Sequence, residues 1–424
     1  MRIKTAGSFL LLSFVCSSCV FQGTNDSSLS DEMGTSISFL TSSEEKTVSS
    51  SPLLSEKENP VELCIATPKK DLAFFQERVE AYLLEKGLSE SLQVTYYLEP
   101  EGEPGAEDLI ADIFIGSDDL LSWKFAKGNQ LLKIEGVYAR SISEKNDPGS
   151  VEAVTMGGFL YGFPFYCSTY TFFYNSSVLS QNDIKDFPSL TKALCDSSKK
   201  AFFNPTNNYY MDVLFSPYGA KTRFAIDQSA KPVLLFNNLN SEAGEKGLRD
   251  AAALYSSGVY EADILHYDNP DYVAGIAFCE ECDEITRNWG ENLAFAKIPC
   301  VDGEADFPIT SCSVQITYSE DAKRNEAALA LAEYLSSEDS QSIWCASHRC
   351  LPSNKEAQKK ATSPFFKALS SQKGNKYPAS PYLGAWSYEY EVLIKEASKL
   401  GSQATSEDLR KLLEVYSENI AKIS

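Results

Sequence analysis

The sequence predicts an α/β protein folded into two lobes. Two observations carry this prediction. Short apolar strands alternate with amphipathic helical segments over residues 61–129, and this order is typical of an α/β sheet covered by helices. The segment that follows a polar N-terminal region, residues 61–424, also exceeds the roughly 250–300 residues at which a single hydrophobic core stops growing.

The chain opens with a segment typical of a secretory signal. A basic start is followed by apolar residues 9–15, which are too few to span a bilayer, and by two serines directly before Cys19. This ending is similar to a bacterial lipobox. We therefore predict a signal peptide over residues 1–19 with lipid attachment at Cys19; ordinary signal cleavage is the alternative.

Residues 20–60 are predicted to form a flexible tether. Ser, Thr and Glu dominate this stretch, and its few apolar residues cannot offset the entropy lost on folding. Such a spacer would lift the folded part away from the membrane surface.

The first folded elements follow from their apolar patterns. The run "VELCIATP" is a short strand ending at proline, and the apolar residues from Phe75 to Leu83 then recur at helical spacing up to Gly87. The run "ADIFIGS" is continuously apolar, as in buried parallel strands. Strands are thus predicted at 61–68, 91–98 and 111–117, with a further helix over 118–129.

The last third of the chain is predicted to be mainly helical. Apolar residues between Ala328 and Leu335 form one stripe, and helices are predicted over 386–400 and 406–423. Ser406 is the expected N-cap of the final helix, since acidic residues occupy the turn after it.

The charge of the chain excludes some partners. There are 38 basic and 59 acidic residues, which give a formal net charge of −21. Nucleic acid and anionic lipid would be repelled. The two histidines, His266 and His348, offer no cluster of metal ligands, and no glycine-rich phosphate loop is present, so we expect neither a metal nor another cofactor.

The order of elements resembles that of the extracellular solute-binding proteins of ABC importers, the class that includes maltodextrin-binding protein. The stretches "LYGFPFYCSTYTFFYN", "EAALALAEYLSSEDSQSIW" and "LPSNKEA" and the tryptophan Trp386 carry this resemblance. It implies a type II periplasmic-binding-protein fold, in which two α/β lobes are joined by crossing segments and the ligand lies in the cleft between them. The implied divisions are 61–166 for the first part of lobe 1, 167–312 for the first part of lobe 2, 313–350 for the return to lobe 1 and 351–424 for the C-terminal helical part of lobe 2.

Within this scaffold the chain also resembles thiaminase I, or thiamine pyridinylase. In that family the catalytic cysteine follows a Tyr-Gly-x-Pro strand, and the catalytic glutamate follows a strand that ends in an aromatic and a small residue. Here "YGFPFYC" supplies Cys167 and "AGIAFCEE" supplies Glu280. The resemblance implies that Cys167 displaces the thiazolium of thiamine and forms a covalent pyrimidine intermediate.

The residue types suit that chemistry. A thiolate is a strong nucleophile that becomes available near neutral pH with modest assistance. No histidine lies near Cys167 in the sequence. A carboxylate with a pKa raised by burial, such as Glu280, is therefore the predicted general base.

Four further positions are predicted to contact substrate. Tyr166 and Tyr170 could stack on a flat ring, and Asp118 follows a strand end, where α/β folds bind ligands. Ser313 stands where the thiaminases carry an aspartate on the second crossing strand. The tyrosines equally suit a core or a sugar site, and Asp118 equally suits a solvated helix start.

The cysteines leave two readings open. Eleven are present, and an odd number follows Cys19, so at least one stays unpaired. Our candidate for the unpaired thiol is Cys167. The alternative is that Cys167 is a buried structural cysteine. Cys345 and Cys350 flank a four-residue loop that a disulfide could close. The "CEEC" run at 279–282 suits a redox couple, half a zinc site or a local disulfide that fixes Glu280, and we favour the disulfide.

A binding protein is the rival to the enzyme. In that reading a monomeric, lipid-anchored receptor in the cell envelope delivers a small solute, such as a sugar or thiamine itself, to an ABC permease. It requires reversible binding with domain closure and no consumption of ligand. We predict the enzyme rather than the receptor, because a receptor has no use for Cys167 together with Glu280.

Overall fold

The computed structural model describes residues 59–99, 111–117, 120–226, 231–261, 267–278, 281–300, 304–348, 350–372, 376–378 and 386–423. The chain divides into two units at residues 59 and 60, and residues 60–424 form the second, compact one. All elements below belong to the second unit. The predicted signal peptide, Cys19 and nearly all of the predicted tether lie outside the described residues.

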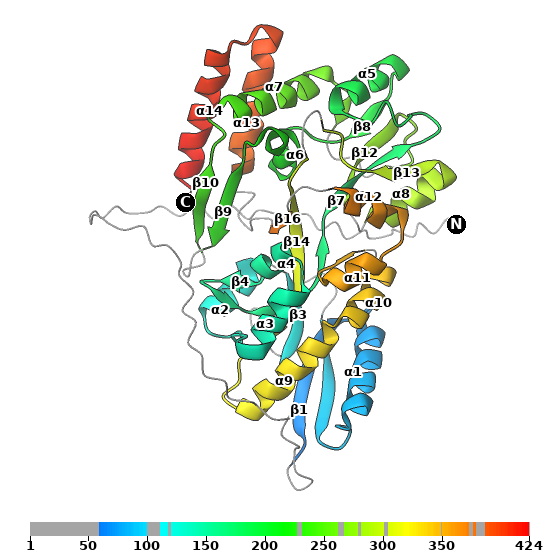
Figure 1. The fold of residues 1–424 in the computed structure, drawn as a ribbon, viewed down its shortest axis with the longest axis vertical. Coiled ribbons are helices and arrows are strands. Elements are labelled where there is room, and N and C mark those ends of the chain that lie inside the picture. The colour runs from blue at the N-terminus through cyan, green and yellow to red at the C-terminus, as the bar shows by residue number, and fades with distance from the viewer. Residues whose placement is uncertain are drawn as a thin grey trace, which may run out of the picture. The chain divides into compact units, whose positions relative to one another are not determined.

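Lobe 1 is built on a mixed sheet in the order β15-β6-β14-β3-β1-β2, and β16 pairs with the start of β14 (Figure 1). Strands β1, β2 and β3 run parallel, whereas β14 is antiparallel to both β3 and β6. The strands are β1 Val61–Pro68, β2 Leu92–Glu99, β3 Ile113–Ser117, β6 Gly162–Ser168, β14 Phe307–Ile316, β15 Leu351–Pro352 and β16 Lys376–Pro378, with a small hairpin of β4 Thr155–Met156 and β5 Phe159–Leu160. The helices are α1 Leu72–Lys86, α2 Leu120–Lys127, α3 Gly136–Lys145, α4 Pro148–Ala153, α9 Ala322–Leu335, α10 Glu338–His348 and α11 Lys355–Lys360.

Lobe 2 is built on a second sheet in the order β11-β8-β12-β7-β13. A separate antiparallel hairpin, β9 with β10, lies beside the C-terminal helices (Figure 1). The strands are β7 Tyr170–Asn175, β8 Lys200–Phe202, β9 Thr222–Ile226, β10 Pro232–Asn237, β11 Tyr260–Glu261, β12 Tyr272–Phe278 and β13 Leu293–Ala296. The helices are α5 Phe187–Ser197, α6 Met211–Phe215, α7 Glu242–Ser257, α8 Cys282–Trp289, α12 Pro364–Ser371, α13 Ser387–Leu400 and α14 Ser406–Ala421, with 3₁₀ turns η1 Asn208–Tyr210, η2 Ser216–Tyr218, η4 Gly290–Asn292 and η6 Gly401–Gln403.

Helix ends follow local chemistry. Helix α1 ends as predicted at Gly87, whose φ of 65° places it in the left-handed region that glycine adopts without strain. The predicted N-cap of α14, Ser406, is wrong by one residue: Thr405 accepts a hydrogen bond from the backbone N–H of Asp408, whose carboxylate in turn accepts from the Thr405 backbone. The capping box needs the acidic residue three positions after the cap, and Thr405 with Asp408 meets that spacing. Among the described residues, no helix combines the length and apolar character needed to cross a membrane.

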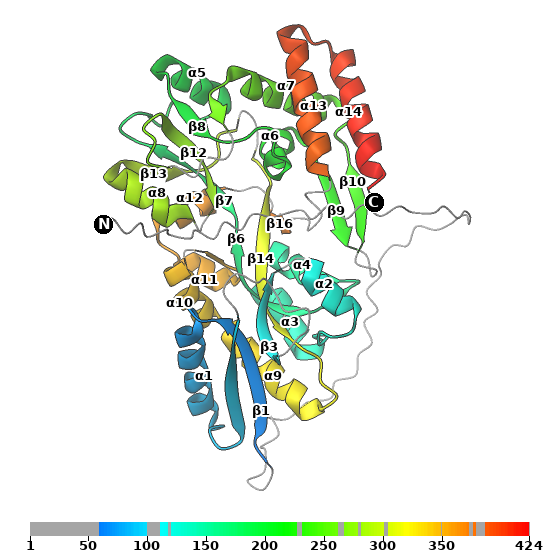
Figure 2. The same cartoon turned by 180° about the vertical axis from the view of Figure 1, so that it is seen from behind.

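Two strands contribute to both hydrophobic cores. Phe165 of β6 and Val314 of β14 are buried in the lobe 1 core with α1 and α9. Cys167 of β6 and Ile309 of β14 are buried in the lobe 2 core with α7, α13 and α14. Strands β6 and β14 are therefore the crossing segments, and Figure 2 shows them between the two sheets. The predicted two-lobed α/β fold is confirmed.

Candidate functional site

The carboxyl edges of the two sheets converge where the crossing strands pass between the lobes. In lobe 1 the last residue of β3, Ser117, pairs with Cys312 of β14, which pairs with Tyr166 of β6. In lobe 2 the last residue of β12, Phe278, pairs with Tyr170 at the start of β7. Ligands of α/β proteins bind at such carboxyl edges. This region, which we call the lobe junction, is therefore the candidate functional site.

An aromatic cluster lies at the junction. The ring of Tyr170 makes edge contacts with the rings of Tyr209, Tyr210 and Phe278, at centroid distances of 5.8, 5.2 and 5.9 Å. Tyr170 is fully buried, whereas the other three are half-buried. Tyr170 thus supports a layer of rings that keep part of their surface in solvent. We call these four residues the junction cluster.

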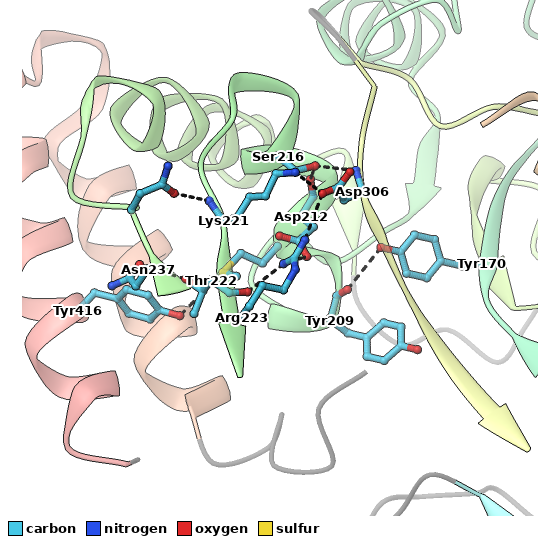
Figure 3. Close-up of polar contacts among 12 residues, drawn as sticks. Tyr170, Tyr209, Asp212, Ser216, Lys221, Thr222, Arg223, Asn237, Asp306 and Tyr416 are labelled. Carbon is cyan, nitrogen blue, oxygen red and sulfur yellow. Dashed lines mark hydrogen bonds and ion pairs between the residues drawn. The ribbon is translucent and has the colours of Figure 1, made fainter. Parts of the chain in front are cut away.

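Tyr209 joins lobe 2 to the crossing strand. Its hydroxyl lies 3.3 Å from the hydroxyl of Thr310 on β14, and its carbonyl accepts a hydrogen bond of 3.5 Å from Tyr170. Its ring points away from Arg223 (Figure 3). Burial and the charge of Asp212 raise the pKa of Tyr170 well above its ordinary value, so Tyr170 keeps its proton at neutral pH and can donate this bond.

Two asparagines set the position of the tyrosines. The carboxamide of Asn204 accepts from the backbone and hydroxyl of Thr206 at 3.0 and 2.8 Å, and Asn207 accepts from the backbone of Tyr209 at 2.9 Å. These local turns follow β8 directly. Since β8 is parallel to β12, they place Tyr209 at the same sheet edge as Phe278.

An ionic network lies beside the junction cluster (Figure 3). Arg223 of β9 binds Asp212 of α6 at 2.8 Å and Asp306, just before β14, at 3.2 Å. Lys221 also pairs with Asp306, and Ser216 accepts a 2.7 Å hydrogen bond from the Asp306 backbone. Both carboxylates are buried. The two cations balance the two anions, so the network attaches β9 to the crossing strand without adding net charge.

One acid of lobe 1 faces this network. Desolvation raises the pKa of Glu152 on α4, whose side chain keeps contact with solvent, and the positive charge of Arg223 opposes that rise. The charge of Arg223 in lobe 2 therefore acts on Glu152 in lobe 1.

The C-terminal tryptophan also packs near β9. Trp386 is buried, and its ring stacks on that of Phe224 at 4.2 Å with an interplanar angle of 21°. Phe224 follows Arg223 along the strand, so the stack and the ionic network hold β9 from opposite sides of its pleat.

The structure buries three of the four predicted site residues that it describes. Cys167 is fully buried in the lobe 2 core, where its strand pairs with Ser311 and Leu351. Tyr170 is equally buried and belongs to the junction cluster. Ser313 is 2% exposed; its hydroxyl donates to the Gly116 carbonyl at 3.4 Å.

Tyr166 does not join the junction cluster but contacts Trp344. It is half-buried, and its ring stacks on Trp344 of α10 at 5.8 Å. The predicted positions therefore share the crossing strands, but Tyr166 and Tyr170 contact different aromatic groups. Glu280, Asp118 and Cys279 of the "CEEC" run lie outside the described residues, so the pairing of Cys167 with Glu280 stays a prediction. The described residues hold no group of three or more potential metal ligands.

The residues predicted from the sequence do not include Tyr209, Tyr210 or Arg223. A signal for the two tyrosines does exist, because the "NPTNNYY" run after a short strand has the composition of a turn at a strand end. No comparable signal marks Arg223. Its partners Asp212 and Asp306 are 11 and 83 residues away.

A separate pocket of 540 Å³ lies between α8, β13 and α12 on one side and α10 and α11 on the other. Phe295, Pro352 and Phe366 give it an apolar lining, and Cys282 and Cys345 border it. No residue of the junction cluster lines this pocket.

Comparison with known proteins identifies the scaffold. A maltodextrin-binding protein from L. casei BL23 shares the fold with a TM-score of 0.69 and 18% identity, over 85% of this chain and 99% of that one. A cyclo/maltodextrin-binding protein complexed with maltotetraose has a TM-score of 0.66 and 19% identity, over 87% and 100%. An extracellular solute-binding protein from Staphylococcus aureus in complex with maltose has a TM-score of 0.65 and 14% identity, over 86% and 98%.

At these identities the likeness of the structures establishes the fold alone. No curated protein matches the sequence. The sequence itself matches the bacterial extracellular solute-binding protein family over residues 111–372, which is more than half of the chain. The chain therefore belongs to the bacterial extracellular solute-binding proteins.

Proposed function

We propose that this chain is the receptor of an ABC importer and binds a neutral, polyhydroxylated solute, such as an oligosaccharide, at the lobe junction. The junction cluster carries this proposal. Half-buried rings can stack on the apolar faces of a sugar, while the hydroxyls of Tyr209 and Thr310 offer hydrogen bonds at the ring edge.

The charge balance supports a neutral ligand. Arg223 and Lys221 beside the cluster are already paired with Asp212 and Asp306, so these two cations are not available to select an anionic solute. The structural relatives bound to maltotetraose and maltose make linear maltodextrins the first ligands to test. In this proposal the receptor is a monomer, is held at the cell envelope by a lipid on Cys19 and passes its solute to a permease.

The burial of Cys167 favours the receptor over a thiaminase I-like transferase. A nucleophile must reach substrate within bonding distance, whereas the Cys167 side chain is fully enclosed by the lobe 2 core. Attack by this sulfur would require the crossing strand to move. A receptor needs no such movement of Cys167.

Calorimetric titration of the purified chain with maltose and maltotetraose tests the receptor proposal. Binding is expected for the wild type, and Tyr209→Ala should weaken it at least tenfold, because an aromatic contact of about 1.4 kcal/mol is lost. Tyr388→Ala is the matched control, since Tyr388 is 70% exposed on α13 and should bind as the wild type does. If Tyr209→Ala binds the ligand as tightly as Tyr388→Ala does, the ligand does not contact the junction cluster.

Incubation with thiamine and an amine or thiol acceptor tests the enzymatic alternative. The receptor proposal predicts intact thiamine and an unchanged protein mass. Release of the thiazole with a pyrimidine adduct on the wild type, and no adduct on Cys167→Ser, would instead establish the transferase.

A further inference from the structure

Two buried cysteines meet at the end of helix α10. Cys345 lies in the last turn of α10, and Cys350 directly precedes β15. Their sulfur atoms are 3.0 Å apart, and each residue is 2% exposed. A disulfide bond is about 2.0 Å long, so the two sulfurs need to approach by only about 1 Å to form one.

This contact lies where lobe 1 connects to a crossing strand. Leu351, the residue after Cys350, pairs with Cys167 of β6. On the other side, Trp344 precedes Cys345 and stacks on His348 at 3.8 Å. A bond between Cys345 and Cys350 would therefore join the end of α10 to the strand that lies against β6.

The family to which the chain belongs is extracellular, and disulfides form and persist in such oxidising surroundings. We infer that Cys345 and Cys350 form a structural disulfide in the exported protein. The two thiols lose two electrons and two protons to a disulfide of a thiol–disulfide oxidoreductase, which becomes a dithiol. Because both sulfurs are buried in the folded chain, the bond forms while the chain is still folding.

The bond is tested by peptide mapping of the exported full chain without reduction. The protein is denatured with iodoacetamide and cut with trypsin, which cleaves at Arg349 between the two cysteines. Peptides 325–349 and 350–355 are expected to stay joined, with a mass two hydrogens below their sum, and to separate after reduction. Cys195, an exposed free thiol, is the internal control and should be alkylated without reduction.

Thermal unfolding measures what the bond contributes. Closing so short a loop is expected to raise the melting temperature by about 3 °C. A reductant should therefore lower the melting temperature of the wild type by about 3 °C more than that of Cys345→Ser/Cys350→Ser. Separate alkylated peptides before reduction would overturn the inference. So would a Cys345 peptide joined to Cys282, which borders the same pocket.

Discussion

At the scale of single residues, Arg223 is the charge on which β9 depends. It pairs with the buried Asp212 and Asp306 and also donates to the Thr222 carbonyl at 2.9 Å. Arg223→Ala leaves Asp212 without its guanidinium partner in a buried place, and removal of one partner of a buried pair costs about 3–5 kcal/mol. Urea unfolding is expected to show a loss near 3 kcal/mol, since Arg223 keeps some solvent contact.

Two comparisons separate charge from packing at Arg223. Adding Asp212→Asn to Arg223→Ala should recover part of the loss, because the buried carboxylate that lost its guanidinium partner is replaced by a neutral amide. Lys192→Ala, which breaks the exposed pair with Asp196, should lower the urea midpoint far less than Arg223→Ala does, because solvent screens an exposed pair. If the double variant is no more stable than Arg223→Ala, the ion pairs do not hold β9.

The reactivity of the Cys300 thiol tests whether its sulfur is shielded from solvent. Burial raises its pKa to about 11, so its reactive thiolate is scarce at neutral pH. The rate of alkylation of Cys300 in the folded protein is expected to keep rising about tenfold per pH unit from pH 8 to 10. Mass spectrometry of the labelled peptide follows the rate, and a plateau near pH 9 would mean that the thiol is not desolvated.

The sequence does not show which side chains of a buried strand reach solvent, nor which residues far apart in the chain come into contact. These two gaps limit the prediction of site residues. The aromatic run around Cys167 correctly marked a crossing strand, but the alternation within a strand that is covered on both faces does not reveal which side chains reach solvent. Cys167 and Ser313 therefore lie on the crossing strands, but their side chains are buried. Tyr209 was missed because its neighbour Phe278 comes near only through the pairing of β12 with β8 and β7.

At the scale of elements, mutations at two adjacent residues, Thr405 and Ser406, test which of them caps helix α14. Thr405→Ala removes the hydroxyl that accepts from the Asp408 backbone and should cost about 1 kcal/mol, or about 1 °C in melting temperature. Ser406→Ala is the matched control and should leave the melting temperature unchanged. An equal loss in both variants would mean that the capping box does not stabilise the helix.

Elements themselves were predictable wherever local patterns decide them. The helix ending at Gly87 and the strands of lobe 1 follow from apolar spacing and breaker residues, and their observed bounds differ from the expected ones by a residue or two. The hairpin β9 with β10 carries few such signals, because Leu235 and Phe236 on β10 are 61% and 50% exposed and interrupt the alternation of apolar and polar residues.

At the scale of the whole molecule, the crossing strands couple the two lobes. Each of β6 and β14 contributes buried side chains to both hydrophobic cores, so neither core can lose its packing without disturbing the strand that completes the other. We therefore expect the two lobes of residues 60–424 to unfold together rather than one after the other.

Tryptophan fluorescence can test this coupling from both sides. Trp344 reports on the lobe 1 core and Trp386 on the lobe 2 core. The chain has four tryptophans, so two variants are needed, each of which keeps Trp344 or Trp386 as its single tryptophan and follows one lobe. Leu413→Ala in α14 removes a fully buried side chain of lobe 2 and should cost about 2–5 kcal/mol. The urea midpoint is expected to fall equally at both probes, whereas Val415→Ala, at a 56% exposed position of the same helix, should shift neither. A midpoint that falls at Trp386 alone would mean that the lobes unfold independently and that the shared strands do not transmit the loss.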